Sequence, residues 1–267
     1  MTSSRWARRC PWGALFLAAC DARQAVPACS EACGGGGEGA GGAQVTGPEC
    51  PLETSARPTV VDISVRDGLL VAVLSNGRVL CWGEDLTQQC GAVYFLKPWY
   101  AAAQACVLEA EVGFPMGVGR TWDDRVAVWG YERNNSAGDG TAEGPAFGEA
   151  LSVPIPTQER VVSAVSGIPN LALTEGGNLW IWGDVALVAG TANDEALPIQ
   201  QPLLYPAPAP VAQVGEEAQC FVTVDREVYC FGTNVNGVLG LESPQSGQLE
   251  PVRIDVPRAQ QLSESSY

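Results

Sequence analysis

The chain offers few of the side chains on which enzyme active sites are usually built. None of its 267 residues is histidine. This excludes Ser-His-Asp and Cys-His catalysis, histidine general bases and histidine metal ligands. The adjacent carboxylates of Asp123 and Asp124 could act as an acid and base pair, but they fall in a predicted hairpin turn, where aspartate is common for its backbone geometry. We therefore predict no catalytic residue, no metal site and no cofactor.

Acidic residues in the predicted loops leave one enzymatic alternative open. Carboxylates alone can hydrolyse glycosidic bonds, so an enzyme acting on an envelope polysaccharide would use residues such as Asp85, Asp139 or Asp184. No spacing selects a pair among them. Asn134–Thr141 contains side chains that could bind calcium, but it does not match the twelve-residue helix-loop-helix site and no glutamate closes it. We interpret it as a surface loop.

The first twenty residues have the pattern of an export signal. Arg5, Arg8 and Arg9 precede a short apolar run, Pro11–Ala19, that is too short to span a bilayer. The run ends in Leu17-Ala18-Ala19-Cys20, which resembles the bacterial lipoprotein cleavage box. This resemblance implies a signal peptide at 1–19 and a lipidated Cys20. The protein would then be anchored in the cell envelope, facing the periplasm or the cell surface. Ordinary secretion is the alternative.

Residues 20–57 are predicted to form a flexible linker. Their middle is rich in glycine between Cys33 and Gly47, and such a segment cannot bury a core. It is not a phosphate-binding loop, because no strand precedes it, no helix follows it and no Lys-Ser/Thr pair ends it. The linker would connect the membrane to a folded domain at 58–257.

The ten cysteines favour disulfides if the chain is exported. Cys220 and Cys230 flank a predicted turn on opposite arms of one hairpin, close enough to form a disulfide. Cys81 occupies the place of Cys230 in an earlier hairpin, where Val71 replaces the other cysteine. The sequence leaves the pairing open for the remaining cysteines: Cys29, Cys33, Cys50, Cys81, Cys90 and Cys106.

The element that organises the chain is a repeated hairpin. In Val71–Gly83, two apolar runs flank Asn76-Gly77, a strong hairpin signal because both residues accept positive φ. The pattern returns about every fifty residues, a period typical of stacked β units. Each second run ends in an aromatic residue that we expect in the core, followed by a glycine that permits a tight backbone approach. These pairs are Trp82-Gly83, Trp129-Gly130, Trp182-Gly183 and Phe231-Gly232.

Proline-rich connectors and short apolar runs precede the hairpins. Pro58–Val65, Pro154–Val165 and Pro206–Val214 are such runs, and Pro251–Pro257 is a further one with no hairpin after it. The fourth repeat, Phe231–Gly240, resembles the repeat of the regulator of chromosome condensation family, a four-stranded β-propeller blade. The spacing from Cys220 to Gly232 is similar to exported bacterial versions.

The resemblance implies an all-β, propeller-like array of about four four-stranded blades, followed by a disordered tail at 258–267. The family usually forms seven blades. Four blades could close a small propeller, with Pro251–Pro257 as the closing strand that completes the first blade. The alternatives are an open arc, a shortened relative or half of a homodimer. An open arc would leave an unpaired strand edge.

The net charge and composition limit the classes of partner that the protein is expected to bind. The net charge of −15 repels phosphate backbones, so no nucleic-acid partner is expected. The nucleotide exchange and chromatin binding of the family's eukaryotic namesake are therefore not carried over. We expect a non-enzymatic binding protein with an unknown protein or glycan partner, attached to the membrane only through its lipid. Trp99 and Tyr100, placed between blades, are the candidate contact, and a buried aromatic pair is the alternative. A passive structural repeat protein is a further alternative.

Overall fold

The computed structural model describes residues 50, 57–85, 89–90, 94–100, 106–113, 116–133, 136–140, 143–185, 198–215, 220–232, 234, 237, 239–240 and 248–260. The chain divides into two compact units, Met1–Gly41 and Gly42–Tyr267, and every described residue lies in the second. The predicted signal peptide and Cys20 lie outside the described residues. Within those that are described, no helix has the length and apolarity needed to cross a bilayer.

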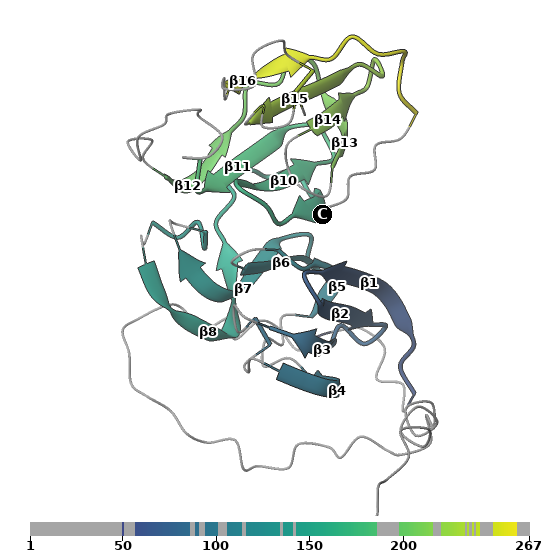
Figure 1. Ribbon diagram of the computed structural model, residues 1–267, viewed down its shortest axis with the longest axis vertical. Coiled ribbons are helices and arrows are strands. Elements are labelled where there is room, and N and C mark those ends of the chain that lie inside the picture. The colour runs from purple at the N-terminus through teal and green to yellow at the C-terminus, as the bar shows by residue number, and fades with distance from the viewer. Residues whose placement is uncertain are drawn as a thin grey trace, which may run out of the picture. The chain divides into compact units, whose positions relative to one another are not determined.

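Four antiparallel sheets, each of four strands in chain order, make up the described fold (Figure 1). We refer to them as blades 1 to 4. Blade 1 is β1 (Val60–Arg66), β2 (Leu69–Leu74), β3 (Val79–Glu84) and β4 (Tyr94–Tyr100), and blade 2 is β5 (Val107–Glu111), β6 (Met116–Thr121), β7 (Val126–Arg133) and β8 (Glu143–Val153). Blade 3 is β9 (Val161–Val165), β10 (Asn170–Thr174), β11 (Leu179–Gly183) and β12 (Ile199–Leu204), and blade 4 is β13 (Val211–Val214), β14 (Cys220–Thr223), β15 (Val228–Gly232) and β16 (Gln248–Arg253).

The all-β architecture of four four-stranded blades is thus confirmed, but one strand was wrongly assigned. Part of Pro251–Pro257 belongs to β16, which pairs with β15 through Cys230↔Val252 and completes blade 4. It does not complete the first blade. The fourth apolar run is an outer strand because it follows the β15 aromatic-Gly, just as β4, β8 and β12 follow theirs.

The hairpin turns differ from the predicted two-residue type. In blade 1, Leu74 N–H donates to Arg78 O at 2.8 Å, and Gly77 N–H donates to Leu74 O. The loop therefore has three residues, with positive φ only at the last, Gly77. This is a type I turn followed by a left-handed residue, the usual three-residue hairpin. The other blades repeat it, with the left-handed residue at Asp124, Gly177 and Arg226.

Neighbouring blades are joined at these turns. The left-handed residue of each turn accepts a hydrogen bond from the first residue of the next blade's first strand. The bonds are Val107 N–H to Gly77 O (3.0 Å), Val161 N–H to Asp124 O (3.1 Å) and Val211 N–H to Gly177 O (2.9 Å). Because backbone groups at strand ends need partners when buried, this bond fixes where each blade meets the previous one.

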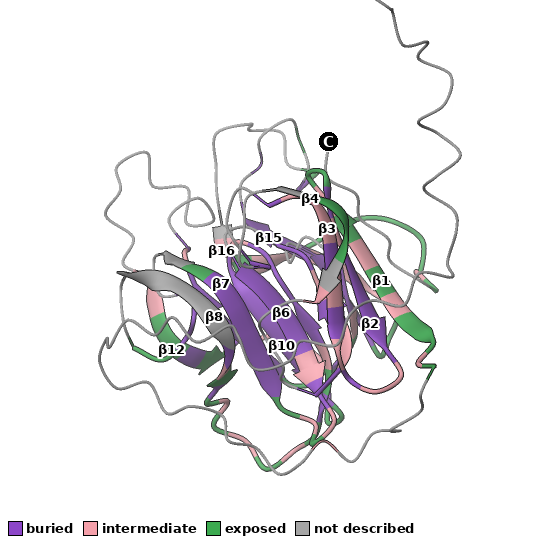
Figure 2. Cartoon of the chain, turned by 90° about the horizontal axis from the view of Figure 1, so that it is seen from below, coloured by how far each residue is buried: buried purple, intermediate pink, exposed green. Residues whose placement is uncertain are grey.

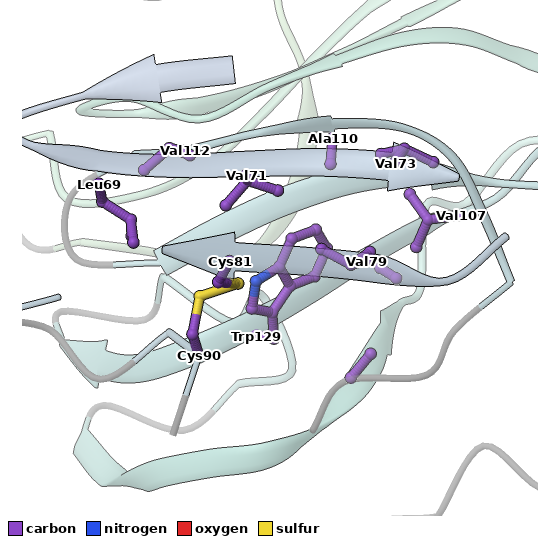
Figure 3. Close-up of a cluster of buried hydrophobic side chains, with 12 residues drawn as sticks. Leu69, Val71, Val73, Val79, Cys81, Cys90, Val107, Ala110, Val112 and Trp129 are labelled. Atoms are coloured by element: carbon purple, nitrogen blue, oxygen red, sulfur yellow. A yellow bond between two sulfur atoms is a disulfide. The ribbon is translucent and has the colours of Figure 1, made fainter. Parts of the chain in front are cut away.

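Each pair of adjacent blades also shares an apolar core. Between blades 1 and 2, the cluster combines Val71, Val79 and Cys81 with Val107 and other side chains of blade 2, and Figure 3 shows the Trp129 indole among them. Two further clusters join blades 2 and 3, and blades 3 and 4. The core of this protein therefore lies between sheets that pack face to face, and each blade depends on its neighbour.

Three of the four aromatic residues before glycine lie in the core, where the repeat pattern predicted all four. Trp129, Trp182 and Phe231 are fully buried, whereas Trp82 is only half-buried. The glycine after Trp82 has φ +111°, and a Cβ on it would lie 2.0 Å from Gly68 O. Only glycine accommodates both the left-handed backbone and this close approach.

Candidate functional site

The carboxylate pair at Asp123 and Asp124 is structural. The Asp124 carboxylate lies 3.2 Å from Arg120 and 3.7 Å from Arg160, which leads into blade 3. Asp123 accepts a hydrogen bond from Thr121 and lies within a turn. The Asp124 carboxylate thus joins the turn of blade 2 to the residue before blade 3, whereas Asp123 makes its contacts within the turn, and the geometry gives both a positioning role rather than an acid-base role.

Asp85 is also part of the scaffold. Its side chain is buried, and its two carboxylate oxygens accept backbone N–H groups of Gln89 (2.9 Å) and Cys90 (2.6 Å). Asn234 stands at the same place after Phe231-Gly232 and accepts from Leu239 N–H at 2.9 Å. An Asp or Asn two residues after the aromatic-Gly therefore organises the following loop by satisfying its backbone donors.

The other two candidate acids follow the third strands of blades 2 and 3, as Asp85 follows the third strand of blade 1. Asp139 is exposed in the loop between β7 and β8, and Asp184 is half-buried directly after β11. Each belongs to a different blade. Within the described ranges, no group of three or more Cys, Asp or Glu side chains is placed to hold a metal ion.

The loop predicted to lie on the surface at Asn134–Thr141 is in part buried. Ser136, Ala137 and Gly138 are buried, and Ser136 O accepts hydrogen bonds from Trp182 Nε1 and from Asn170 Nδ2, both at 3.0 Å. The surface-loop interpretation is therefore wrong for these three residues. Trp182 and Asn170 belong to the next blade, so this loop of blade 2 helps to hold blade 3 in place.

The structure contains three disulfides. Cys220 pairs with Cys230 across the β14–β15 hairpin, with a Cα–Cα distance of 4.0 Å. Cys81, whose partner the sequence left open, forms a disulfide with Cys90, nine residues later. The third disulfide, Cys50–Cys106, spans 56 residues and ties the residues before blade 1 to the start of blade 2. Cys29 and Cys33 lie outside the described residues.

Trp99 and Tyr100 do not lie between blades as predicted, because both belong to β4, the outer strand of blade 1. The Arg78 guanidinium lies 3.6 Å above the centre of the Tyr100 ring, a cation–π contact that occupies one face of that ring. The same strand exposes Leu96 completely, at 101% of its reference area, beside Lys97 and Pro98. The exposed large apolar side chain described on β4 is therefore one that sequence reasoning did not select.

A second exposed apolar surface lies on β1 and was also missed. Val60, Ile63 and Val65 are 58%, 56% and 62% exposed, although all three are paired with residues of β2. Figure 2 shows β1 largely green and pink beside the buried β2. The sequence carried one usable signal, because residues 1–57 contain no copy of the repeated hairpin.

Two titratable groups show how polar side chains tie strands together. Burial and the charge of Glu250 raise the pKa of Tyr205, whose hydroxyl donates to Leu249 O at 2.6 Å and joins blades 3 and 4. Hydrogen bonds from Thr174 and Asn178 lower the pKa of Glu159, which precedes β9. Both groups stabilise strand junctions, and Arg160, the residue after Glu159, has its pKa raised by its hydrogen bond to Glu175 and the charge of that side chain.

Comparison with known proteins identifies the fold. No protein-family model matches the chain. Among solved structures, yeast RCC1 (Prp20) in complex with Kap60 superposes with a TM-score of 0.66 at 16% identity, over 77% of this chain and 50% of that one. This fold is that of RCC1-type propeller blades. Prp20p from Saccharomyces cerevisiae, in a second structure, gives a TM-score of 0.65 at 16% identity over 77% and 52% of the two chains.

Human WBSCR16 gives a similar result, with a TM-score of 0.61 at 16% identity over 76% of this chain and 54% of that one. The chain thus spans about half the length of the structures it matches. At this identity the comparison establishes the blade fold and its order, and the partner of this chain has to be argued from its own surface.

Proposed function

We propose that this chain is a lipid-anchored binding protein outside the cytoplasm that presents its propeller surface to a protein partner. Three features support the proposal: the export pattern before Cys20, the three disulfides, and the use of Asp85, Asp123 and Asp124 in the scaffold. The similar yeast protein has partners named with its structures, Kap60, Gsp1p and histones, which are proteins. A glycan partner is the second candidate, and an enzyme acting on envelope polysaccharide is the alternative.

The observation that carries the proposal is the surface of β4. Leu96 is fully exposed on an edge strand, and Pro98 removes a backbone donor from that edge. An edge interrupted by proline is protected against strand addition, so contacts there are made by side chains. An exposed leucine on a strand that also contains the aromatic residues at 99–100 has the composition of an interface centre.

The binding surface is tested with matched leucine substitutions in the full chain. A photo-crosslinker at Lys97 should capture a protein in intact cells, and Leu96→Asp should abolish the adduct. Leu203→Asp is the control, because Leu203 is exposed on β12, the outer strand of blade 3. Equal adducts in both variants, or no adduct with the unsubstituted chain, would contradict a partner at β4.

The anchor is tested by the mass of the mature protein. Membrane-extracted chain should begin at Cys20 and carry diacylglycerol and acyl groups, and Cys20→Ser should accumulate uncleaved and unlipidated. A soluble mature chain without lipid would contradict the anchor while leaving the binding surface untouched. Hydrolysis of purified cell-wall glycans that is lost on Asp139→Asn or Asp184→Asn would instead favour the enzymatic alternative.

A further inference from the structure

The first strand of every blade begins in the same way. We call Val60, Val107, Val161 and Val211 the entry residues, because each opens the first strand of its blade. Each is followed by a bulge in the pairing with the second strand, at Val60/Asp62, Val107/Glu109 and Val211/Gln213 in blades 1, 2 and 4, and at the corresponding place in blade 3. The shared irregularity fixes which residues correspond between blades.

This correspondence shows that β1 is built to be covered. The entry residues of blades 2 to 4 are at most 3% exposed, whereas Val60 is 58% exposed. Ile63 corresponds to Ala110, Ala164 and Val214, which are all buried, and it is 56% exposed. Apolar residues at the same places are therefore buried in three blades and open to solvent in blade 1.

The structure also shows what covers the corresponding strands. In blade 2, β5 packs against the side chains of Val71, Val79 and Cys81 on the face of blade 1 that is turned toward it, and its entry residue donates to the turn of that blade (Figure 3). The same arrangement recurs before blades 3 and 4. The surface complementary to β1 is thus the corresponding face of another blade, together with its turn carbonyl.

The chain possesses one such face at its other end. In blade 4, the residues that correspond to Val71, Val79 and Cys81 are Cys220, Val228 and Cys230, and they form a small cluster with Leu239 and Ile254. The turn carbonyl of this blade, Arg226 O, accepts a hydrogen bond from Ala259 N–H at 3.0 Å. Ala259 therefore takes the place of an entry residue, but with an alanine where each blade has a valine.

We propose that a second copy of this chain covers β1 by packing its blade 4 against it, head to tail. In this contact, Val60 N–H of one copy replaces Ala259 of the other at Arg226 O. Packing β1 against blade 4 would bury the apolar side chains of Val60, Ile63 and Val65. Ala259 has a smaller apolar side chain than Val60, so replacing it with β1 buries more apolar area and favours the contact between copies. Two copies contribute eight blades, and propellers with four to eight blades form closed rings. A contact between two different faces of the same chain also produces a closed ring when the rotation from one copy to the next returns to the first copy.

The test is the association state of the full chain in detergent, measured by sedimentation at physiological salt over a range of concentrations. The unsubstituted chain should form a species of two or more copies, and Ile63→Asp should raise its dissociation constant about tenfold or more. Val61→Asp is the matched control. Val61 is 55% exposed on the same strand, but its counterpart Val162 remains 41% exposed in a covered blade, so this charge should leave association unchanged.

The C-terminal segment provides the second arm. Deletion of residues 258–267 frees Arg226 O and should strengthen association. A photo-crosslinker at position 63 should then link to residues 220–232 of another copy, which mass spectrometry can identify. A monomer at all concentrations, both with and without residues 258–267, would overturn the proposal. A cross-link from one β1 to the other β1, or to residues 1–57, would also overturn it, because another occupant would then cover the strand.

Discussion

Blades 1 and 3 have the same four strands, the same turn and the same Trp-Gly pair, yet they differ in how well their first strands are packed. Val161 is 3% exposed in blade 3, whereas Val60 is 58% exposed in blade 1. Trp182 is fully buried and Trp82 is half-buried. Because the residue types match, the difference comes from the neighbouring sheet and not from the strand itself. In a repeat array, burial is a property of the interface between two units.

Charge substitution at the entry residues should show this difference most strongly. Val161→Asp places a carboxylate in the core between blades 2 and 3 and should destabilise the chain by about 4 kcal/mol or more, or prevent folding. Val60→Asp at the same place in blade 1 should change the free energy of unfolding by less than about 0.5 kcal/mol. Urea denaturation of dilute protein measures both. Similar losses for the two variants would contradict the open face of β1.

Reduction of the disulfides should have the second-largest effect, and it should destabilise blade 1 more than blade 3. Cys81–Cys90 lies within blade 1 and Cys50–Cys106 spans it, whereas blade 3 has no cysteine in its sequence. From the lengths of the closed loops, removing Cys50–Cys106 should cost about 4 kcal/mol and removing Cys81–Cys90 about 2.5 kcal/mol. Hydrogen exchange with and without reductant should therefore show faster exchange in β2 and β3. Faster exchange first in β10 and β11 would argue that blade 3 depends on these bonds more than blade 1 itself does.

Blades 1 and 3 also differ in the residue that organises the loop after the aromatic-Gly pair, and we expect a smaller effect on stability there. Asp85 accepts two backbone N–H groups in blade 1, while the same place in blade 3 is taken by the buried Val185. Asp85→Ala should cost about 2–3 kcal/mol, because it leaves buried donors without that acceptor. Asp85→Asn keeps one acceptor oxygen and should recover part of the loss. A thermal melt distinguishes them, and equal midpoints for Asp85→Ala and the unsubstituted chain would show that water satisfies this loop.

Acid should weaken blade 3 slightly through Glu159. Hydrogen bonds from Thr174 and Asn178 lower its pKa in the folded state, so its contribution to stability is complete above the ordinary glutamate pKa and is lost as the pH falls through the lowered value. The difference in unfolding midpoint between the unsubstituted chain and Glu159→Gln should therefore shrink between neutral pH and about pH 3. A difference that does not depend on pH would assign the effect of Glu159 to packing instead of charge.

Local patterns in the sequence predicted the blades well. Turn residues and alternating apolar runs located the hairpins, and their spacing gave the number of blades and the Cys220–Cys230 pair. Features that depend on a neighbouring blade were not predictable in this way. Ser136 is buried because Trp182 of the next blade donates to its carbonyl, and β1 is exposed although its apolar run resembles those of the other first strands. The alternation of apolar residues predicts which face of a strand is apolar, but it does not predict which part of the protein packs against that face.

The central claim is that β1 has an open face that matches the end of the same chain. Hydrogen exchange of the full chain at low and at high protein concentration tests it most directly. The account predicts that peptides covering 58–66 and 220–232 gain protection together as concentration rises, while the amide of Ala259 loses protection at Arg226 O. Protection in 58–66 that is high at every concentration, or that rises without any change in blade 4, would contradict it.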